Sequence, residues 1–165
     1  MTNGPITTST PKPTPIAGIT LLDDQAVFEQ MSQQIASEEG LPDVDGRRCV
    51  DQAICFTALA GRFPGKALAP SADVDLGWRM FIVNTVVYRA FCQRVAGHFV
   101  DRVPLKDAAQ TTTSDGRHIY SPFESASLLV DAGYLVDWLV WPRANDPYEP
   151  LSHAIGAPTD TTDPR

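Results

Sequence analysis

The sequence contains few of the residues from which metal sites and disulfide frameworks are built. It has three histidines and three cysteines in 165 residues, and no histidine lies three or four positions from a cysteine or another histidine. Zinc ligands are usually closely spaced pairs of these residues, so we expect no metal site, and no motif suggests another cofactor. The odd number of cysteines (Cys49, Cys55 and Cys92), all within or beside apolar positions, favours reduced, buried thiols over a disulfide framework.

Long hydrophobic runs and basic clusters are also missing. No apolar run approaches the roughly 20 residues that a helix needs to cross a bilayer, and the first fifteen residues lack the hydrophobic core of a secretion signal. The net charge is −7, and no basic cluster exceeds pairs such as Arg47 and Arg48, whereas nucleic-acid binding depends on many phosphate contacts. We therefore expect a cytoplasmic protein that binds neither membranes nor nucleic acids.

The composition is that of one folded domain with polar ends. Hydrophobic residues make up 43% of the chain and charged residues 20%, which is enough for a single core at this length. Residues 1–19 are mostly Thr, Pro, Ser and small residues, which predicts a disordered arm. A helical domain is predicted over residues 20–142. Four prolines within residues 143–165 predict an irregular, Pro-rich tail there.

The densest apolar stretch, residues 71–97, is expected to be the element around which the domain is organised. Its apolar residues recur every three or four positions, as on a helix, but a single straight helix would place apolar lines on two opposite sides. A break near Asn84 and Thr85 resolves this conflict. The pattern then predicts helices over 73–83 and 86–96, with Ser71 beginning the first, Thr85 capping the second and Gly97 ending it.

Three further helices are predicted around this stretch. Thr20 has capping-box spacing for a helix ending near Gly40, and a second helix is expected over 45–61. Ser121, Pro122 and Glu124 predict the start of a third, which runs to about residue 132. Residues 98–120 are expected to be a long polar connection, and residues 134–141 a compact apolar segment. The fold predicted is all-α: one small helical bundle of about five helices with disordered N- and C-terminal tails.

The segments PSADVDLGW (70–78) and YRAFC (88–92) carry a family resemblance. They resemble the conserved block of the glycine-rich-domain-containing-protein-like family, with small actinobacterial members most similar. The resemblance extends over roughly residues 45–141, including GYLVD at 133–137. It implies a small helical fold more firmly than any activity.

Departures from the family pattern indicate a loss of imidazoles. Where the family has histidine after the tryptophan, this chain has Arg79, and Phe81 replaces a second histidine. Asp101 and Arg102 stand where related small proteins often carry two histidines, and no cysteine follows Cys92. An arginine offers no lone pair to a metal. If family members bind a metal through these groups, this chain has lost the ligands, and we assign no metal-binding or catalytic residue.

Two interpretations remain open around the start of the 73–83 helix. Asp73, Asp75 and Arg79 beside Trp78 are either a salt-bridged helix start over a core tryptophan or a charged cleft for a small ligand, with residues 98–120 as its lid. A catalytic pair of Cys92 with His98 is disfavoured, because a thiol on an apolar stripe is inert. Asp101 and Asp137 keep no assigned role.

The second apolar line of residues 71–97 consists of Met80, Val83, Val87 and Phe91. It needs a cover, which is either the segment Trp138–Trp141 or another protein. Because the family block keeps its packing residues (Val74, Trp78, Tyr88 and Cys92) while losing its imidazoles, we predict a non-catalytic accessory subunit that binds and stabilises a partner enzyme encoded nearby. The resemblance implies a place in an actinobacterial natural-product biosynthetic pathway. The alternative is a small-molecule-binding protein, or an enzyme in its own right, with a cleft near Asp75, Trp78 and Arg79. The predicted ligand or partner contacts are Asp75, Trp78, Arg79, Met80, Val83, Val87, Phe91, Trp138 and Trp141.

Overall fold

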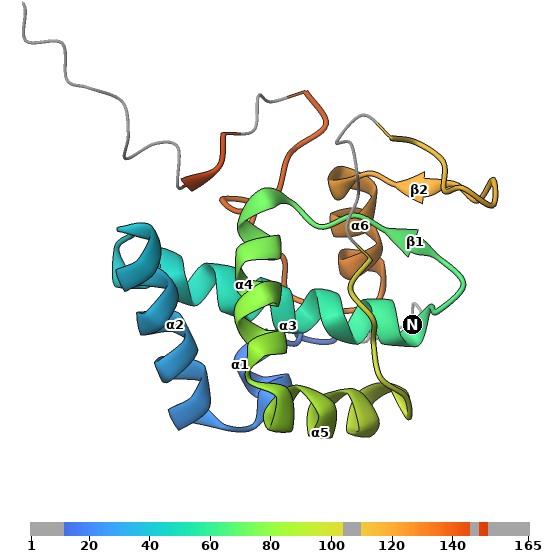
Figure 1. Ribbon diagram of the computed structural model, residues 1–165. Helices are drawn as coiled ribbons and strands as arrows, with labels where there is room; N and C mark the ends of the chain where they lie inside the picture. The colour runs from blue at the N-terminus through green and yellow to red at the C-terminus, as the bar shows by residue number, and fades with distance from the viewer. Residues whose placement is uncertain (1–11, 104–109, 146–148, 152–165) are drawn as a thin grey trace, which may run out of the picture.

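Helices dominate the part of the chain that the computed structural model describes, which is residues 12–103, 110–145 and 149–151 (Figure 1). The all-α prediction is confirmed, with six helices and one short sheet in these ranges. No helix in them is long and apolar enough to cross a membrane. The helices are α1 (Gly18–Leu22), α2 (Gln25–Glu39), α3 (Asp43–Arg62), α4 (Ala72–Val83), α5 (Thr85–Ala96) and α6 (Pro122–Asp131). The strands are β1 (Ala67–Leu68) and β2 (Ile119–Tyr120).

The central element is α3, not the 71–97 stretch. Figure 1 shows α4 crossing in front of α3, with α2 on one side and α6 with the strands on the other. The eleven residues from Cys49 to Leu59 are all buried except Asp51. Several of these are small (Ala, Cys and Thr), so neighbours can approach α3 from every side. Apolar density pointed to α4 and α5, but the number of covered faces decides which helix lies at the centre.

Glycines allow the closest of these approaches. A Cβ atom added to Gly77 of α4 would lie 2.1 Å from the Cys49 carbonyl oxygen of α3, and one added to Gly46 of α3 would lie 2.3 Å from the Ser32 carbonyl oxygen of α2. Real side-chain atoms do not approach backbone so closely. α2 and α4 can therefore pack this closely on α3 only because these two positions are glycines, which have no side chain.

The predicted break near Asn84 is confirmed, and α4 and α5 meet there at a corner (Figure 1). Ser71 accepts a hydrogen bond from the Val74 amide as N-cap, and Gly97 ends α5 with a φ of 73°. The predicted cap at Thr85 is wrong. Asn84 occupies the N-cap position without a side-chain cap bond, and its amide nitrogen instead donates to the Met80 carbonyl oxygen at 2.9 Å.

The corner also directs different parts of the second apolar line toward different neighbours. Met80 lines a hollow against Ile35 of α2, and Phe91 packs 5.2 Å from the Phe81 ring. Trp141 lies elsewhere, against Phe56 of α3. Trp141 therefore does not cover this line, contrary to one of the two interpretations. The bend at Asn84 turns the two halves of the line toward different neighbours.

The chain before α2 is more ordered than predicted. Ile16 donates its amide to the Gly133 carbonyl oxygen at 2.9 Å, so the last residues of the expected arm are part of the fold. Thr20 does not cap the long helix, since it lies within α1. Asp24 begins α2 instead, accepting a hydrogen bond from the Val27 amide. Residues 1–11 of the predicted arm lie outside the described residues.

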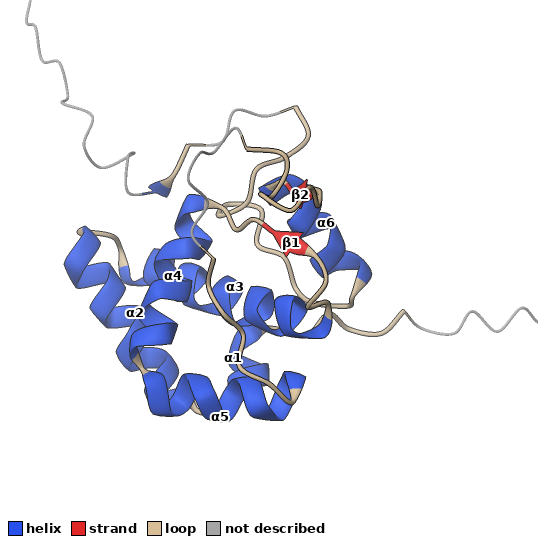
Figure 2. Ribbon diagram, turned by 45° about the vertical axis from the view of Figure 1, so that its right-hand side comes forward, coloured by secondary structure: helices blue, strands red, loops and turns tan. Residues whose placement is uncertain are grey.

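Residues 98–120, expected to be a polar connection, end in a short strand. β1 and β2 pair in parallel, with Ala67 opposite Ile119 and Leu68 opposite Tyr120 (Figure 2). Before β2, an isolated bridge joins Thr112 and His118 around a tight turn. The capping box predicted at the start of α6 is confirmed, with both Ser121 and Glu124 making its reciprocal bonds.

Buried polar side chains hold the segment after α6 against α3 and α4. Gln52 accepts from the Trp141 indole nitrogen at 2.9 Å and donates to the Leu135 carbonyl oxygen at 3.0 Å. Asp73, fully buried, accepts from the Leu151 amide at 3.1 Å. These bonds satisfy groups that would be costly to bury alone. Part of the predicted Pro-rich tail is thereby fixed, while residues 146–148 and 152–165 lie outside the described residues.

Candidate ligand-binding pocket

A pocket of about 340 Å³ opens between α3, α4, the chain around β1 and the residues that follow α5. It will be called the Trp78 pocket. Its volume is within the range of small-molecule sites, and its lining combines an apolar interior with several charged groups, as such sites do. The lining residues are Phe56, Ala60, Pro64, Lys66, Ala67, Leu68, Trp78, His98, Val100, Asp101, Val103, Thr113 and Arg117.

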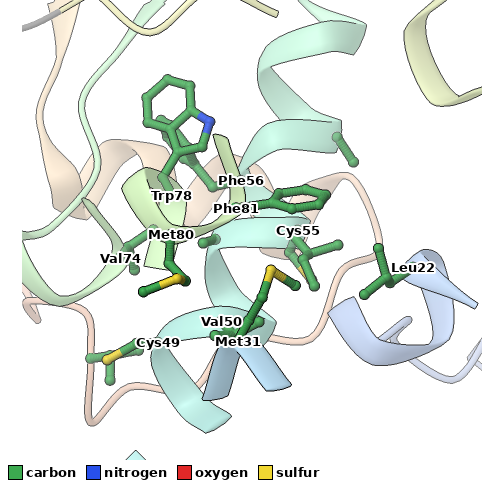
Figure 3. Close-up of a cluster of buried hydrophobic side chains, with 14 of the residues drawn as sticks. Leu22, Met31, Cys49, Val50, Cys55, Phe56, Val74, Trp78, Met80 and Phe81 are labelled. Atoms are coloured by element: carbon green, nitrogen blue, oxygen red, sulfur yellow. The ribbon is translucent and has the colours of Figure 1, made fainter. Parts of the chain in front are cut away.

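Two aromatic rings form part of the apolar lining. Trp78 of α4 packs edge-to-face on Phe56 of α3, with ring centroids 5.0 Å apart, and Figure 3 shows both within the buried cluster. Trp78 and Met80 leave α4 in different directions in this view, and of the two only Trp78 lines the pocket. The tryptophan predicted from the sequence as a contact residue is therefore a pocket residue as well as a core residue.

A chain of two hydrogen bonds positions Trp78. Its indole nitrogen donates to the Tyr88 hydroxyl at 3.1 Å, and that hydroxyl donates to the Val100 carbonyl oxygen at 2.6 Å. Burial raises the pKa of Tyr88 well above its ordinary value, so the hydroxyl stays protonated. Through Tyr88 of α5, these bonds tie α4 to the segment that provides Val100 and Asp101, and so fix these two walls of the pocket relative to each other.

The β1–β2 pairing places Lys66 at the pocket. Lys66 directly precedes β1, and its ammonium group lies 2.8 Å from the Tyr120 hydroxyl and 4.6 Å from the centre of the Tyr120 ring. Tyr120 is in β2, 54 residues away. The hydroxyl and the ring face both favour an ammonium group at this position, so the sheet holds the lysine beside the lining of the pocket.

The tight turn before β2 contributes Thr113 and Arg117. The Thr113 hydroxyl accepts from the Arg117 amide at 2.9 Å, and Gly116, with a φ of 80°, provides the left-handed residue that this turn requires. The Arg117 guanidinium donates from Nε to Asp115 at 2.8 Å. Both residues of this pair are more than half exposed, so the pair contributes little to stability, and Arg117 remains accessible at the pocket.

The cleft predicted from Asp75, Trp78 and Arg79 is not one site. Trp78 lines the pocket, but Asp75 is bound by Arg102, whose Nε and Nη2 donate to its two carboxylate oxygens at 2.8 and 2.7 Å. These bonds raise the pKa of Arg102. The predicted ion pair between Arg79 and Asp75 is present, with 3.4 Å between Arg79 Nε and Asp75 Oδ2, but it is longer and more exposed than the pair with Arg102. Arg102 therefore holds Asp75 in a structural bridge between α4 and the segment after α5.

The other predicted contact residues are divided between core and surface. Met80, Phe91 and Trp141 are buried, and so are not available to a partner in this conformation. Val87 and Trp138 are half-buried, and Arg79 is exposed. Val83 is 67% exposed, as is its neighbour across the corner, Val86, at 82%. The sequence pattern could not separate these residues, because it does not show which face of each helix meets α2 or α3.

The cysteines and histidines form no reactive pair in the described residues. All three thiols are free and buried, and burial raises the pKa of Cys92, while His98 is exposed, with Nδ1 3.2 Å from the Ala96 carbonyl oxygen. Asp137 is paired with Arg48 on α3, whereas Asp101 lines the pocket. No group of three or more potential metal ligands was found in the described ranges, and His153 lies outside them.

Comparisons with protein-family models, with curated proteins and with solved structures find no match to this chain. The resemblance of residues 70–92 to the glycine-rich-domain-containing-protein-like family therefore stays a prediction. The case for a function depends on the geometry of the pocket and of the exposed surface.

Proposed function

We propose that this protein binds a small organic molecule in the Trp78 pocket. The observation that carries the proposal is the convergence of Trp78, Lys66 and Arg117 on one pocket of about 340 Å³ from three separate parts of the chain. Core packing alone gives no reason to place two cations beside an apolar cavity. Apolar lining with a few convergent polar groups is the usual character of ligand sites.

The pocket walls are also held in advance of binding. The Tyr88 hydroxyl links Trp78 to Val100, and the Lys66 contact with Tyr120 spans the sheet. A preformed site loses less conformational entropy when it binds than one that must be ordered. Two other hollows lie along open helix faces, one between α2 and α4 and one beside α5.

Filling the pocket tests this proposal. Ala60→Leu adds a branched side chain to a lining position on α3, and we expect it to weaken binding of pocket ligands at least tenfold while the protein stays folded. Binding can be followed by amide and indole chemical shifts during a fragment screen, with the Trp78 indole N–H as the reporter. Ala26→Leu, on an exposed face of α2, makes the same change away from the pocket. A screen in which no fragment perturbs the Trp78 and Val100 signals would contradict the proposal.

A second candidate is the accessory subunit, and the exposed corner between α4 and α5 favours it. Val83 and Val86 lie on either side of Asn84 and are both largely exposed, and hollows of about 270 and 450 Å³ flank them. The first hollow is bordered by Glu38 and Glu39. Exposed apolar side chains beside acidic ones suit a partner surface with apolar and basic residues. We propose that such a partner is an enzyme encoded nearby.

Co-expression with the product of the neighbouring gene tests the second candidate. We expect a mixed complex in size-exclusion chromatography with light scattering, and we expect the double change Val83→Ser and Val86→Ser to weaken it at least tenfold. Val44→Ser removes a similarly exposed valine from α3 and should leave the complex intact. A protein that stays monomeric beside its neighbour's product, or a complex indifferent to the corner variant, would rule out this role for the corner.

A further inference from the structure

The charge at the Trp78 pocket is opposite in sign to that of the whole protein. The chain has 20 acidic and 13 basic residues, yet the lining contains Lys66 and Arg117 against the single carboxylate of Asp101. Counting histidine as neutral, the lining carries one net positive charge in a protein of net charge −7. Local charge of this kind attracts and orients a ligand of the opposite sign.

Neither cation at the pocket is fully occupied by acidic groups among the described residues. Lys66 bonds only to a neutral phenol there, and it has no carboxylate within ion-pair distance in those ranges. Arg117 uses Nε for Asp115, and no acceptor within the described chain bonds its other guanidinium hydrogens. Ammonium and guanidinium groups with free donors are the usual binding groups for carboxylates.

The rest of the lining determines what else the ligand contains. Leu68 and Val103 provide most of the accessible apolar surface, with smaller parts of Trp78 and Val100, while Phe56 is fully buried behind Trp78. This surface suits a hydrocarbon or aromatic body. Asp101 lines the same pocket and would repel a second negative charge. The lining therefore favours one anionic group over two.

From this arrangement we infer that the Trp78 pocket binds a small aromatic or similarly apolar monocarboxylic acid, with Lys66 and Arg117 binding its carboxylate. The inference rests on the proposed function, because it specifies the ligand class of the same pocket. The apolar body lies against Trp78, Leu68 and Val103. Lys66, oriented by Tyr120, distinguishes the acid from its neutral amide.

Three compounds with the same ring test the inference. They are 1-naphthaleneacetate, its neutral analogue 1-naphthaleneacetamide, and the dianion 1-naphthyl phosphate, each titrated into the full-length protein while the Trp78 indole and Val100 amide signals are recorded. We expect the acetate to bind at least tenfold more tightly than the amide, and more tightly than the phosphate. Lys66→Gln should remove most of the preference for the acetate while changing the affinity for the amide less than threefold. Lys12→Gln removes the same charge at an exposed position outside the pocket and should change neither affinity.

The outcomes separate the ligand class from the proposed function. Equal affinity for acetate and amide, tighter binding of the phosphate, or a Lys66→Gln protein that keeps the wild-type preference would overturn the monocarboxylate inference and leave a pocket that binds small molecules. Failure of all three compounds to shift the Trp78 and Val100 signals would also overturn it. If the fragment screen of the Ala60→Leu experiment is silent as well, the proposed function fails with it.

Discussion

Gly77→Ala is expected to lower the free energy of unfolding by about 3 kcal/mol, toward the upper end of the costs measured for overpacking. The new Cβ atom would lie 2.1 Å from the Cys49 carbonyl oxygen, 2.6 Å from its carbon and 2.9 Å from the Ala53 Cβ atom. Two of these atoms are backbone, so no side chain can rotate away. α4 would have to move away from α3. The free-energy cost of this movement exceeds the roughly 1 kcal/mol by which alanine is more favourable than glycine in a helix.

Urea denaturation followed by circular dichroism measures this loss. Gly65→Ala is the control, because no atom lies within 4 Å of its added Cβ and its φ is not left-handed; it should change the free energy by less than about 0.5 kcal/mol. A Gly77→Ala protein as stable as the wild type would mean that α3 and α4 do not approach as closely as described. Since α4 provides Trp78, we also expect weaker binding in the Trp78 pocket of this variant.

The packing at Gly77 also explains which parts of the fold the sequence predicted. Helix ends were readable where one residue decides them locally, as with Ser71, Gly97 and the capping box at Ser121. The break at Asn84 was readable because two helices agreed better with the apolar pattern than one did. The central position of α3 could not be predicted from the apolar pattern, because it follows from the small residues of α3 and from glycines on the helices around it. Such residues add little to any measure of hydrophobicity.

The pocket was predictable only in part, for a related reason. Trp78 is marked by its place in an apolar stripe and by the resemblance at residues 70–78. Lys66 and Arg117 carry no local signal, because they come together through a parallel pairing of two residues in each strand, with about 50 residues between the strands. Parallel pairs of this length have no periodicity to detect. Asp75 and Arg79 were correctly placed as neighbours, but the dominant partner, Arg102, is 27 residues away from Asp75.

Alkaline pH is expected to destabilise the protein steeply. Burial, together with the negative charges of Asp73 and Asp45, raises the pKa of Cys49 from 9.0 to about 12, and burial raises the pKa of Cys55 well above its ordinary value. In the unfolded chain these thiols lose their protons near pH 9, whereas in the folded protein they keep them. The protonated thiols therefore contribute fully to the free energy of unfolding below about pH 9, and this contribution is lost as the pH rises further.

Each such thiol costs about 1.4 kcal/mol per pH unit once the unfolded form is ionised. Between pH 9 and 11, Cys49 alone should remove about 2 kcal/mol, and Cys55 should add to this loss. Domains are stable by only roughly 5–15 kcal/mol. Urea midpoints measured at pH 8 and pH 11 report the loss. The double variant Cys49→Ala and Cys55→Ala is expected to be less stable at pH 8, because it leaves small cavities, yet to lose much less on going to pH 11. Lysine and tyrosine ionisation is common to both proteins and cancels in the comparison. Equal losses in the two proteins would show that the buried thiols do not govern the alkaline limit, and that α3 is more open to hydroxide and solvent than its packing indicates.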